Sequence, residues 1–146
     1  MDLTTSFPRS VRDEIAGVVM LARTTDKAKA KAHGNIGEYH YNCPMDKGVF
    51  GFLGIDADAF YETVKNAKGD AEIEAYAKTF VTKKSPEEIA GFNGEFLKSA
   101  PAPGSEGATY FHELRDSLDK SRTDITTWPD LLDLDEKRPV PHRQVA

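Results

Sequence analysis

Apolar side chains recur at helical spacing along most of this chain, and that period limits the fold more than any other feature. Intervals of three and four residues, which define one face of a helix, separate Ile73, Tyr76, Ala77, Phe80 and Val81. The same kind of spacing relates Val11, Ile15, Val18, Val19 and Ala22. No segment alternates apolar and polar residues for long enough to predict a half-buried strand. The pattern therefore predicts an all-α protein.

Helix boundaries follow from capping residues, prolines and glycines. Ser85-Pro86-Glu87-Glu88 has the capping-box pattern, and Asp56, Asp70 and Thr127 are further predicted caps. About seven helices are expected, over residues 9–33, 44–53, 57–67, 71–82, 86–98, 106–119 and 128–135. Trp128, at the start of the last helix, is expected to be buried. We expect one compact helical domain over residues 1–136 and a flexible tail over 137–146, where Pro139 and Pro141 prevent a helix and little is available to pack.

Composition places the chain among soluble globular proteins. With 146 residues, 39% hydrophobic and 29% charged, it has enough apolar surface to fold without a metal or a disulfide. A single cysteine cannot form an intrachain disulfide, which favours a reduced, cytoplasmic location. The longest apolar run, Ile15 to Ala22, is too short to cross a bilayer and follows two acids, so neither a membrane segment nor an export signal is expected.

The charge balance argues against nucleic acid as a partner. The net charge is −5, and three of the 19 basic residues lie in the tail, which has no acidic residue. The body therefore holds 16 basic and 24 acidic residues, a net charge of −8. An acidic body is repelled by phosphate backbones at long range.

The densest run of reactive side chains is Glu38 to Asp46, and it contains the only cysteine. Pro44 favours an extended Cys43 at the start of a helix, where backbone amides stabilise a thiolate, although Asp46 in the first turn opposes it. Cys43 is therefore a candidate nucleophile, with His40 as a candidate base. The competing interpretations are a small buried hydrophobe for Cys43 and a hydrogen-bonded structural histidine for His40, with Tyr39 and Tyr41 on the face opposite to it.

A metal site is only weakly indicated. Glu38, His40 and Cys43 are all residues that bind zinc, but a fourth ligand would have to come from His33, His112 or a distant carboxylate. No Cys-x-x-Cys or His-x-x-x-His spacing is present, and neither are a phosphate-binding glycine loop, a serine elbow or an HExxH motif. No metal or cofactor is predicted.

A basic stripe runs along the first predicted helix at Arg23, Lys27 and Lys31. Cations near a helix C-terminus favour the helix dipole, which accounts for much of this stripe without a ligand. Arg23 directly follows the apolar run Val18 to Ala22, so its guanidinium is expected to meet a carboxylate or a bound anion.

Several short motifs together resemble an uncharacterised family, domain of unknown function 5069, from near the start of the chain to about Glu136. They are Pro8-Arg9-Ser10, Ala16 to Thr24 with Asp26 to Ala28, Gly37 to Tyr41 with Cys43, Pro44 and Asp46, Phe52 to Ile55, and Thr123 to Trp128 with Leu131 to Asp135. The resemblance implies a bacterial single-domain protein and no mechanism. It transfers no catalytic residue.

Our first hypothesis is a binding module for a small anionic metabolite or a protein partner, with Arg23, Lys27, Tyr39, His40 and Tyr41 near the site. The alternative is an enzyme that uses Cys43 as a thiol nucleophile or a metal held by Glu38, His40 and Cys43. A third hypothesis is a structural or assembly role, for which exposed apolar faces would be the sign. The sequence leaves the oligomeric state open.

Overall fold

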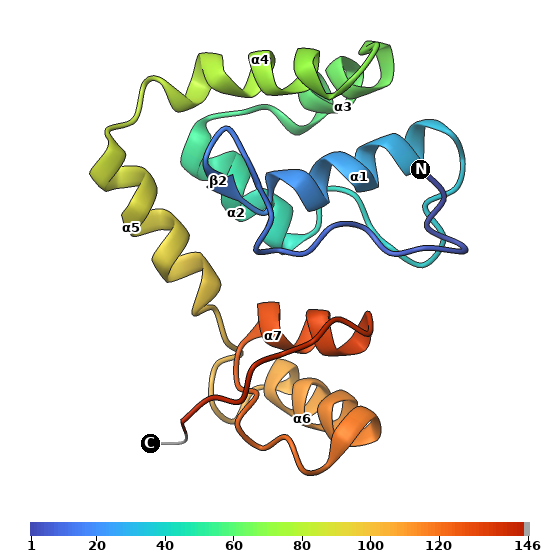
Figure 1. Cartoon of the computed structure of the whole chain (residues 1–146), viewed down its shortest axis with the longest axis vertical. Helices are drawn as coiled ribbons and strands as arrows, with labels where there is room; N and C mark the ends of the chain where they lie inside the picture. The colour runs from blue at the N-terminus through green and yellow to red at the C-terminus, as the bar shows by residue number, and fades with distance from the viewer. Residues whose placement is uncertain (145–146) are drawn as a thin grey trace. The chain divides into compact units, whose positions relative to one another are not determined.

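The structure, a computed structural model, describes residues 1–144. In that range the chain is predominantly helical, as the sequence predicts (Figure 1). The helices are α1 (Leu21–Ala32), α2 (Pro44–Leu53), α3 (Ala57–Asn66), α4 (Asp70–Val81), α5 (Pro86–Leu97), α6 (Glu106–Asp119) and α7 (Trp128–Asp135). Two short strands, β1 (Glu14–Ile15) and β2 (Val18–Val19), precede α1. None of these helices is both long and apolar enough to cross a membrane.

The first predicted helix, residues 9–33, is wrong over its first half. Residues 14–19 form an antiparallel hairpin in which Glu14 pairs with Val19 and Ile15 with Val18. Ala16 and Gly17 turn the hairpin with φ angles of 54° and 80°, and Met20 has φ 74° at the residue before α1. A right-handed helix cannot contain such positive φ angles. The apolar spacing across this segment therefore reflects burial in a hairpin and not a helix face.

The remaining boundaries lie within one or two residues of the predictions, and the caps explain why. Ser85 accepts from the Glu88 amide at 3.1 Å while Glu88 accepts from the Ser85 amide at 3.0 Å, which completes the predicted capping box. Asp56 and Thr127 also cap as expected. Asp70 does not, because Gly69 occupies the cap position and Asp70 is the first residue of α4.

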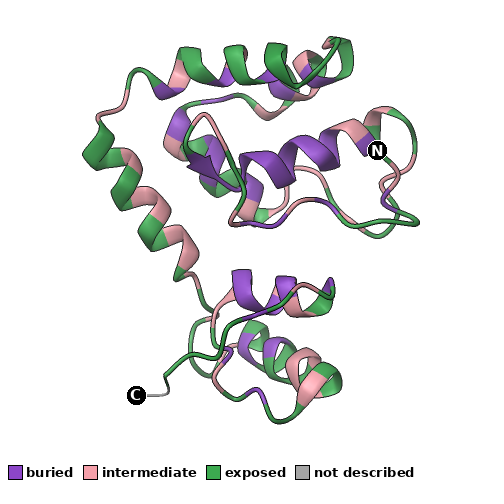
Figure 2. Ribbon diagram, viewed as in Figure 1, coloured by how far each residue is buried: buried purple, intermediate pink, exposed green. Residues whose placement is uncertain are grey.

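The chain divides into two compact units, residues 1–93 and 94–146. The organisation predicted from the sequence, a helical domain over 1–136 with a flexible tail over 137–146, stays a prediction. In the first unit α1 packs on α3 and α2, and α3 packs on α4. Figure 2 shows α1 buried along most of its length. Large apolar side chains fill this unit, among them Leu21, Phe60 and Ile73, each no more than 1% exposed.

The part of α5 that belongs to the first unit, residues 86–93, contacts the hairpin through Asn93 and α2 through Phe92. The Asn93 side-chain amide donates to the Gly17 carbonyl at 2.9 Å and accepts from the Val19 amide at 3.1 Å. The neighbouring Phe92 ring stacks on Phe52 with centroids 4.3 Å apart. The side chain of Asn93 thus bonds the hairpin as a backbone strand would.

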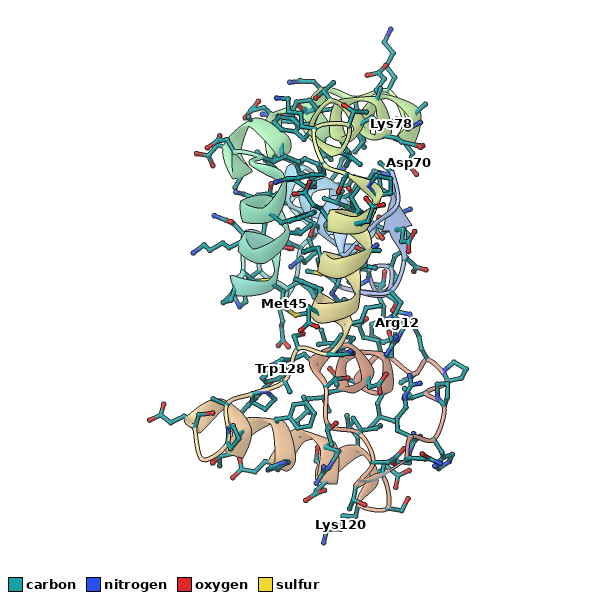
Figure 3. The ribbon with its side chains drawn as sticks, turned by 90° about the vertical axis from the view of Figure 1, so that its left-hand side faces the viewer. Arg12, Met45, Asp70, Lys78, Lys120 and Trp128 are labelled. Atoms are coloured by element: carbon teal, nitrogen blue, oxygen red, sulfur yellow. The ribbon has the colours of Figure 1, made fainter. Side chains whose placement is uncertain are left out.

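The second unit has its own core, around α6 and α7. Phe111, Ile125, Leu131 and Val140 are buried together, with Leu114, Trp128 and Leu134 packed around them. Trp128, labelled in Figure 3, lies at the start of α7 with its ring edge-on to Phe111 at 5.1 Å. It is half-buried and not buried as predicted, because it borders this cluster instead of filling it.

The first part of the tail packs against the second unit. Val140 is 9% exposed, and the Arg143 guanidinium pairs with Asp130. The expectation that this segment has little to pack therefore does not hold for residues 138–143. Residues 145–146 lie outside the described part of the chain.

Candidate functional site

The first half of α1 combines strong polarity with burial. Arg23, Asp26 and Lys27 are 4%, 2% and 3% exposed, and Thr24 is fully buried. Charged groups are rarely buried unless they are paired, because removing them from water is costly. The partners of these side chains therefore define the most distinctive polar site in the first unit.

Lys27 lies at the centre of a cluster formed with Thr24, Cys43 and Asp46, which we call the Lys27 cluster. Its ammonium lies 2.7 Å from Asp46 Oδ2, 2.9 Å from the His40 carbonyl oxygen and 3.3 Å from Cys43 Sγ. Because an ammonium has three N–H donors, these three acceptors use all of them. Asp46 also accepts from Thr24 Oγ1 at 2.6 Å and from the Cys43 amide at 3.2 Å.

The local sequence explains how α2 presents this cluster. Cys43 is extended (φ −68°, ψ 171°), as the following Pro44 favours, and it is the cap residue of α2. Asp46 in the first turn of α2 then points back to the Cys43 amide, as in a capping box. Asn42 adopts φ 63°, which asparagine tolerates better than most residues and which turns the chain into the cap.

A second ion pair, in which Asp26 is buried and the Arg9 side chain is 37% exposed, joins α1 to the segment before the hairpin. Asp26 accepts from Arg9 Nε and Nη2, both at 3.1 Å, and from the Arg9 amide at 2.8 Å. Arg23 donates to the Arg9 carbonyl at 3.2 Å, and its guanidinium lies 5.6 Å from the centre of the Tyr39 ring. Arg23 thus meets a backbone carbonyl and an aromatic face, and the carboxylate or anion expected for it stays a prediction.

Tyr41, one of the two tyrosines beside His40, makes contacts that are structural. Tyr41 donates its hydroxyl to the Ala57 carbonyl at 2.7 Å, and its ring lies against Phe50 and Tyr61. Burial, with the negative charge of Asp46 nearby, raises the pKa of Tyr41 well above its ordinary value. Tyr41 therefore stays a protonated donor throughout the physiological range.

The predicted site residues fall into two groups. Arg23, Lys27, Tyr39 and Tyr41 are buried or half-buried and hold residues 38–43 in place, whereas the side chains of Glu38 and His40 are exposed. Cys43 is half-buried. Among the described residues no group of three or more His, Cys, Asp or Glu side chains is placed to hold a metal, so Glu38, His40 and Cys43 are not brought together as ligands.

Sequence reasoning missed Asp46 as the partner of Lys27 and Asp26 as the partner of Arg9. Asp46 has a sufficient local explanation, an acid in the first turn of a helix, so nothing in its position required a buried cation. One signal in the sequence could have pointed to these ion pairs. The motifs that carry the family resemblance include all of the following residues: Arg9, Arg23, Asp26, Lys27 and Asp46.

Comparison with protein families places the chain in a family. Residues 5–138 match a family model described as a domain of unknown function, DUF5069. No curated protein matches the chain. The match spans helices α1 to α7 and the Lys27–Asp46 and Arg9–Asp26 pairs, and the chain belongs to the DUF5069 family.

Proposed function

We propose that this protein is a binding module that recognises a protein partner through residues 38–43, the recognition segment. The observation that carries the proposal is the bond from the buried Lys27 ammonium to the His40 carbonyl at 2.9 Å. It fixes the backbone at the position whose side chain is exposed to solvent. The next residue, Tyr41, is held through its own hydroxyl, which donates to the Ala57 carbonyl at 2.7 Å.

The energetics of the Lys27 cluster support a role in positioning. A buried ion pair often contributes no more to stability than a well-packed apolar pair of similar volume. Lys27 and Asp46 are 3% and 0% exposed, so their desolvation is nearly complete. What an apolar pair would not supply is the set of bonds to the His40 carbonyl and the Cys43 amide. A segment held in one conformation loses less entropy on binding, which raises affinity.

The same geometry favours a protein partner over a small anion. Lys27, the cation nearest the segment, already donates to three acceptors. An anion would have to displace Asp46 or a carbonyl to reach it. A protein surface can instead contact the exposed Glu38 and His40 side chains without disturbing the cluster.

Site-specific photo-crosslinking in cells tests this function. A photoreactive amino acid in place of His40 is expected to give one or two discrete crosslinked species. The matched control places it at His112, an exposed histidine on α6. Adding Lys27→Met with Asp46→Asn, which removes the ion pair without changing net charge, is expected to abolish the crosslinks at position 40. Equal crosslinking from both positions, or crosslinks that are unaffected by the double substitution, would contradict the proposal.

A thiol-dependent enzyme is the second candidate, because Cys43 Sγ lies 3.3 Å from the Lys27 ammonium, which is itself oriented by Asp46. A cation held beside a cysteine stabilises the thiolate, which is one way in which enzymes activate a nucleophile. Alkylation of the native protein by iodoacetamide tests the assignment. An activated thiol is labelled rapidly at neutral pH and slowly in the Lys27→Met/Asp46→Asn variant. Slow native labelling that becomes fast on denaturation identifies Cys43 as a packing residue.

The proposed setting is the cytoplasm of a bacterium. A single cysteine, which requires no oxidising compartment, supports the cytoplasm, and the family resemblance supports the bacterial origin. Fractionation with an antibody against the protein would test the location.

A further inference from the structure

Residues 140–143, which we call the strap, lie on the second unit as an extended segment. Val140 is the strap residue whose side chain is buried, while Pro141, His142 and Arg143 are exposed. The valine joins the cluster of Phe111, Ile125 and Leu131. The strap therefore contacts the unit through one apolar side chain and a set of polar bonds.

Arg122 supplies the donors for the strap backbone. Its Nη2 donates to the carbonyl oxygens of Val140 at 3.0 Å and Pro141 at 3.1 Å. Asp124 holds the Arg122 guanidinium in place with two bonds of 3.0 and 3.1 Å. This pairing with Arg122 lowers the pKa of Asp124 well below its ordinary range. Asp124 is therefore ionised at any pH at which the protein is used.

Arg143 is bound by two carboxylates. Its Nε and Nη2 form a bidentate pair with Asp130, each bond 3.1 Å long, and its amide donates to Asp124 at 2.8 Å. Paired bonds between guanidinium and carboxylate are directional and select arginine over lysine. The surface beneath the strap thus offers an apolar contact, donors for two carbonyls and a carboxylate fork, at fixed separations.

We propose that this surface is a binding site for an extended segment of a partner protein, in which an apolar residue is followed three positions later by arginine. The strap occupies that site in cis as an internal competitor. An extended segment containing proline loses little entropy on binding, as in other modes of peptide recognition. Three of the four strap residues are exposed, and such segments open at a free energy below that of global unfolding. The site is thereby available to a partner while the unit stays folded.

Peptide binding to the full-length protein tests the proposal. The probe is a fluorescent peptide with the sequence of residues 137–146, measured by anisotropy against the wild type and the Val140→Ala/Arg143→Ala variant. A tethered competitor acts at millimolar effective concentration, so the variant should bind the peptide at least about tenfold more tightly than the wild type. A peptide carrying the same two alanines should bind neither protein. Tyr110→Ala, at a side chain of α6 that is 60% exposed and lies outside the strap, should behave as the wild type.

Three results would overturn the proposal: no binding to the variant, equal affinity of the two proteins for the probe, or equal binding of the two peptides. Far-UV circular dichroism establishes that the variant is folded, and Arg143→Ala alone replaces it if the double substitution unfolds the chain. A wild-type dimer formed by exchange of straps, detected by size-exclusion chromatography, would assign the site to a second copy and would also overturn it.

Discussion

Helices α1 and α5 each contain 12 residues, and they reverse the usual relation between polarity and burial. Nine residues of α1 are buried, including an arginine, an aspartate and a lysine. No residue of α5 is buried, although it carries Ile89, Phe92, Phe96 and Leu97. Figure 2 shows the contrast directly.

The difference shows that the burial of a helix depends on how many other elements surround it. The polarity of its buried side chains then decides which hydrogen-bond or ion-pair partners they need. Helix α1 packs on α2, α3 and the hairpin, so each buried charge must find a specific partner. The residues of α5 that belong to the first unit contact other elements of that unit: Phe92 stacks on Phe52, and Asn93 bonds to the hairpin. Substitutions should therefore be severe in α1 and mild in α5.

The largest effect is expected at Asp46. Asp46→Ala leaves the Lys27 ammonium buried beside a carbonyl and a thiol without its counterion, which should lower the free energy of unfolding by about 3–5 kcal/mol. Urea denaturation measures the loss. Lys27→Met/Asp46→Asn should recover most of it, because neither charge then remains. A loss below about 1 kcal/mol for Asp46→Ala would show that water reaches the cluster.

Phe92→Ala on α5 should cost less. Complete burial of a phenylalanine makes its truncation worth about 3–5 kcal/mol, and for this half-buried ring we expect about 2 kcal/mol. The loss comes from the stack with Phe52. Thermal and urea denaturation should agree on the value. A cost equal to that of Asp46→Ala would remove the contrast between the two helices.

Gly91→Ala should stabilise α5. Gly91 does not have a positive φ, and a Cβ there would meet no atom within 4 Å. Alanine is favoured over glycine inside a helix by about 0.8–1 kcal/mol. The melting temperature of the Gly91→Ala variant is expected to rise. A fall would show that the exposed face of α5 is covered in solution.

The smallest effect is expected at the exposed end of α1, where Lys29 pairs with Asp70. The hydrogen bond from Lys29 lowers the pKa of Asp70. The stabilisation is therefore complete above the unfolded value of 3.8 and is lost as the pH falls through the lowered folded value. Because both side chains are substantially exposed, a double-mutant cycle with Lys29→Ala and Asp70→Asn should give less than about 0.5 kcal/mol at neutral pH. A coupling as large as that of a buried pair would contradict this ranking.

The helices from α2 onward were predictable because their signals are local. Ser85, Asp56 and Pro44 mark helix starts through backbone chemistry that acts within four residues. The hairpin was missed because Val11, Val18 and Val19 are all buried, which gives the same apolar spacing as a helix face. Gly17 was the available warning, since a glycine between two apolar pairs also suits a tight turn.

The sequence singled out the segment from Glu38 to Asp46 by its density of reactive side chains, but not the contacts that this segment makes with α1. The role of the segment as a binding site stays a proposal. The selection of Asp46 as the partner of Lys27 depends on how α2 packs against α1, and no sequence spacing encodes that contact. Lys27 was predicted as part of a basic stripe near the end of a helix, and its burial was not predicted, because a lysine is seldom as little exposed as 3%.

The two units carry one natural probe each. The chain has a single tryptophan and a single cysteine, and Trp128 lies in the second unit while Cys43 lies in the first. Tryptophan emission and the rate of thiol labelling therefore follow separate halves of one molecule without any added dye. If both signals change at the same denaturant concentration, the halves melt as one thermodynamic system; if they separate, an intermediate with one half intact is populated and open to direct study.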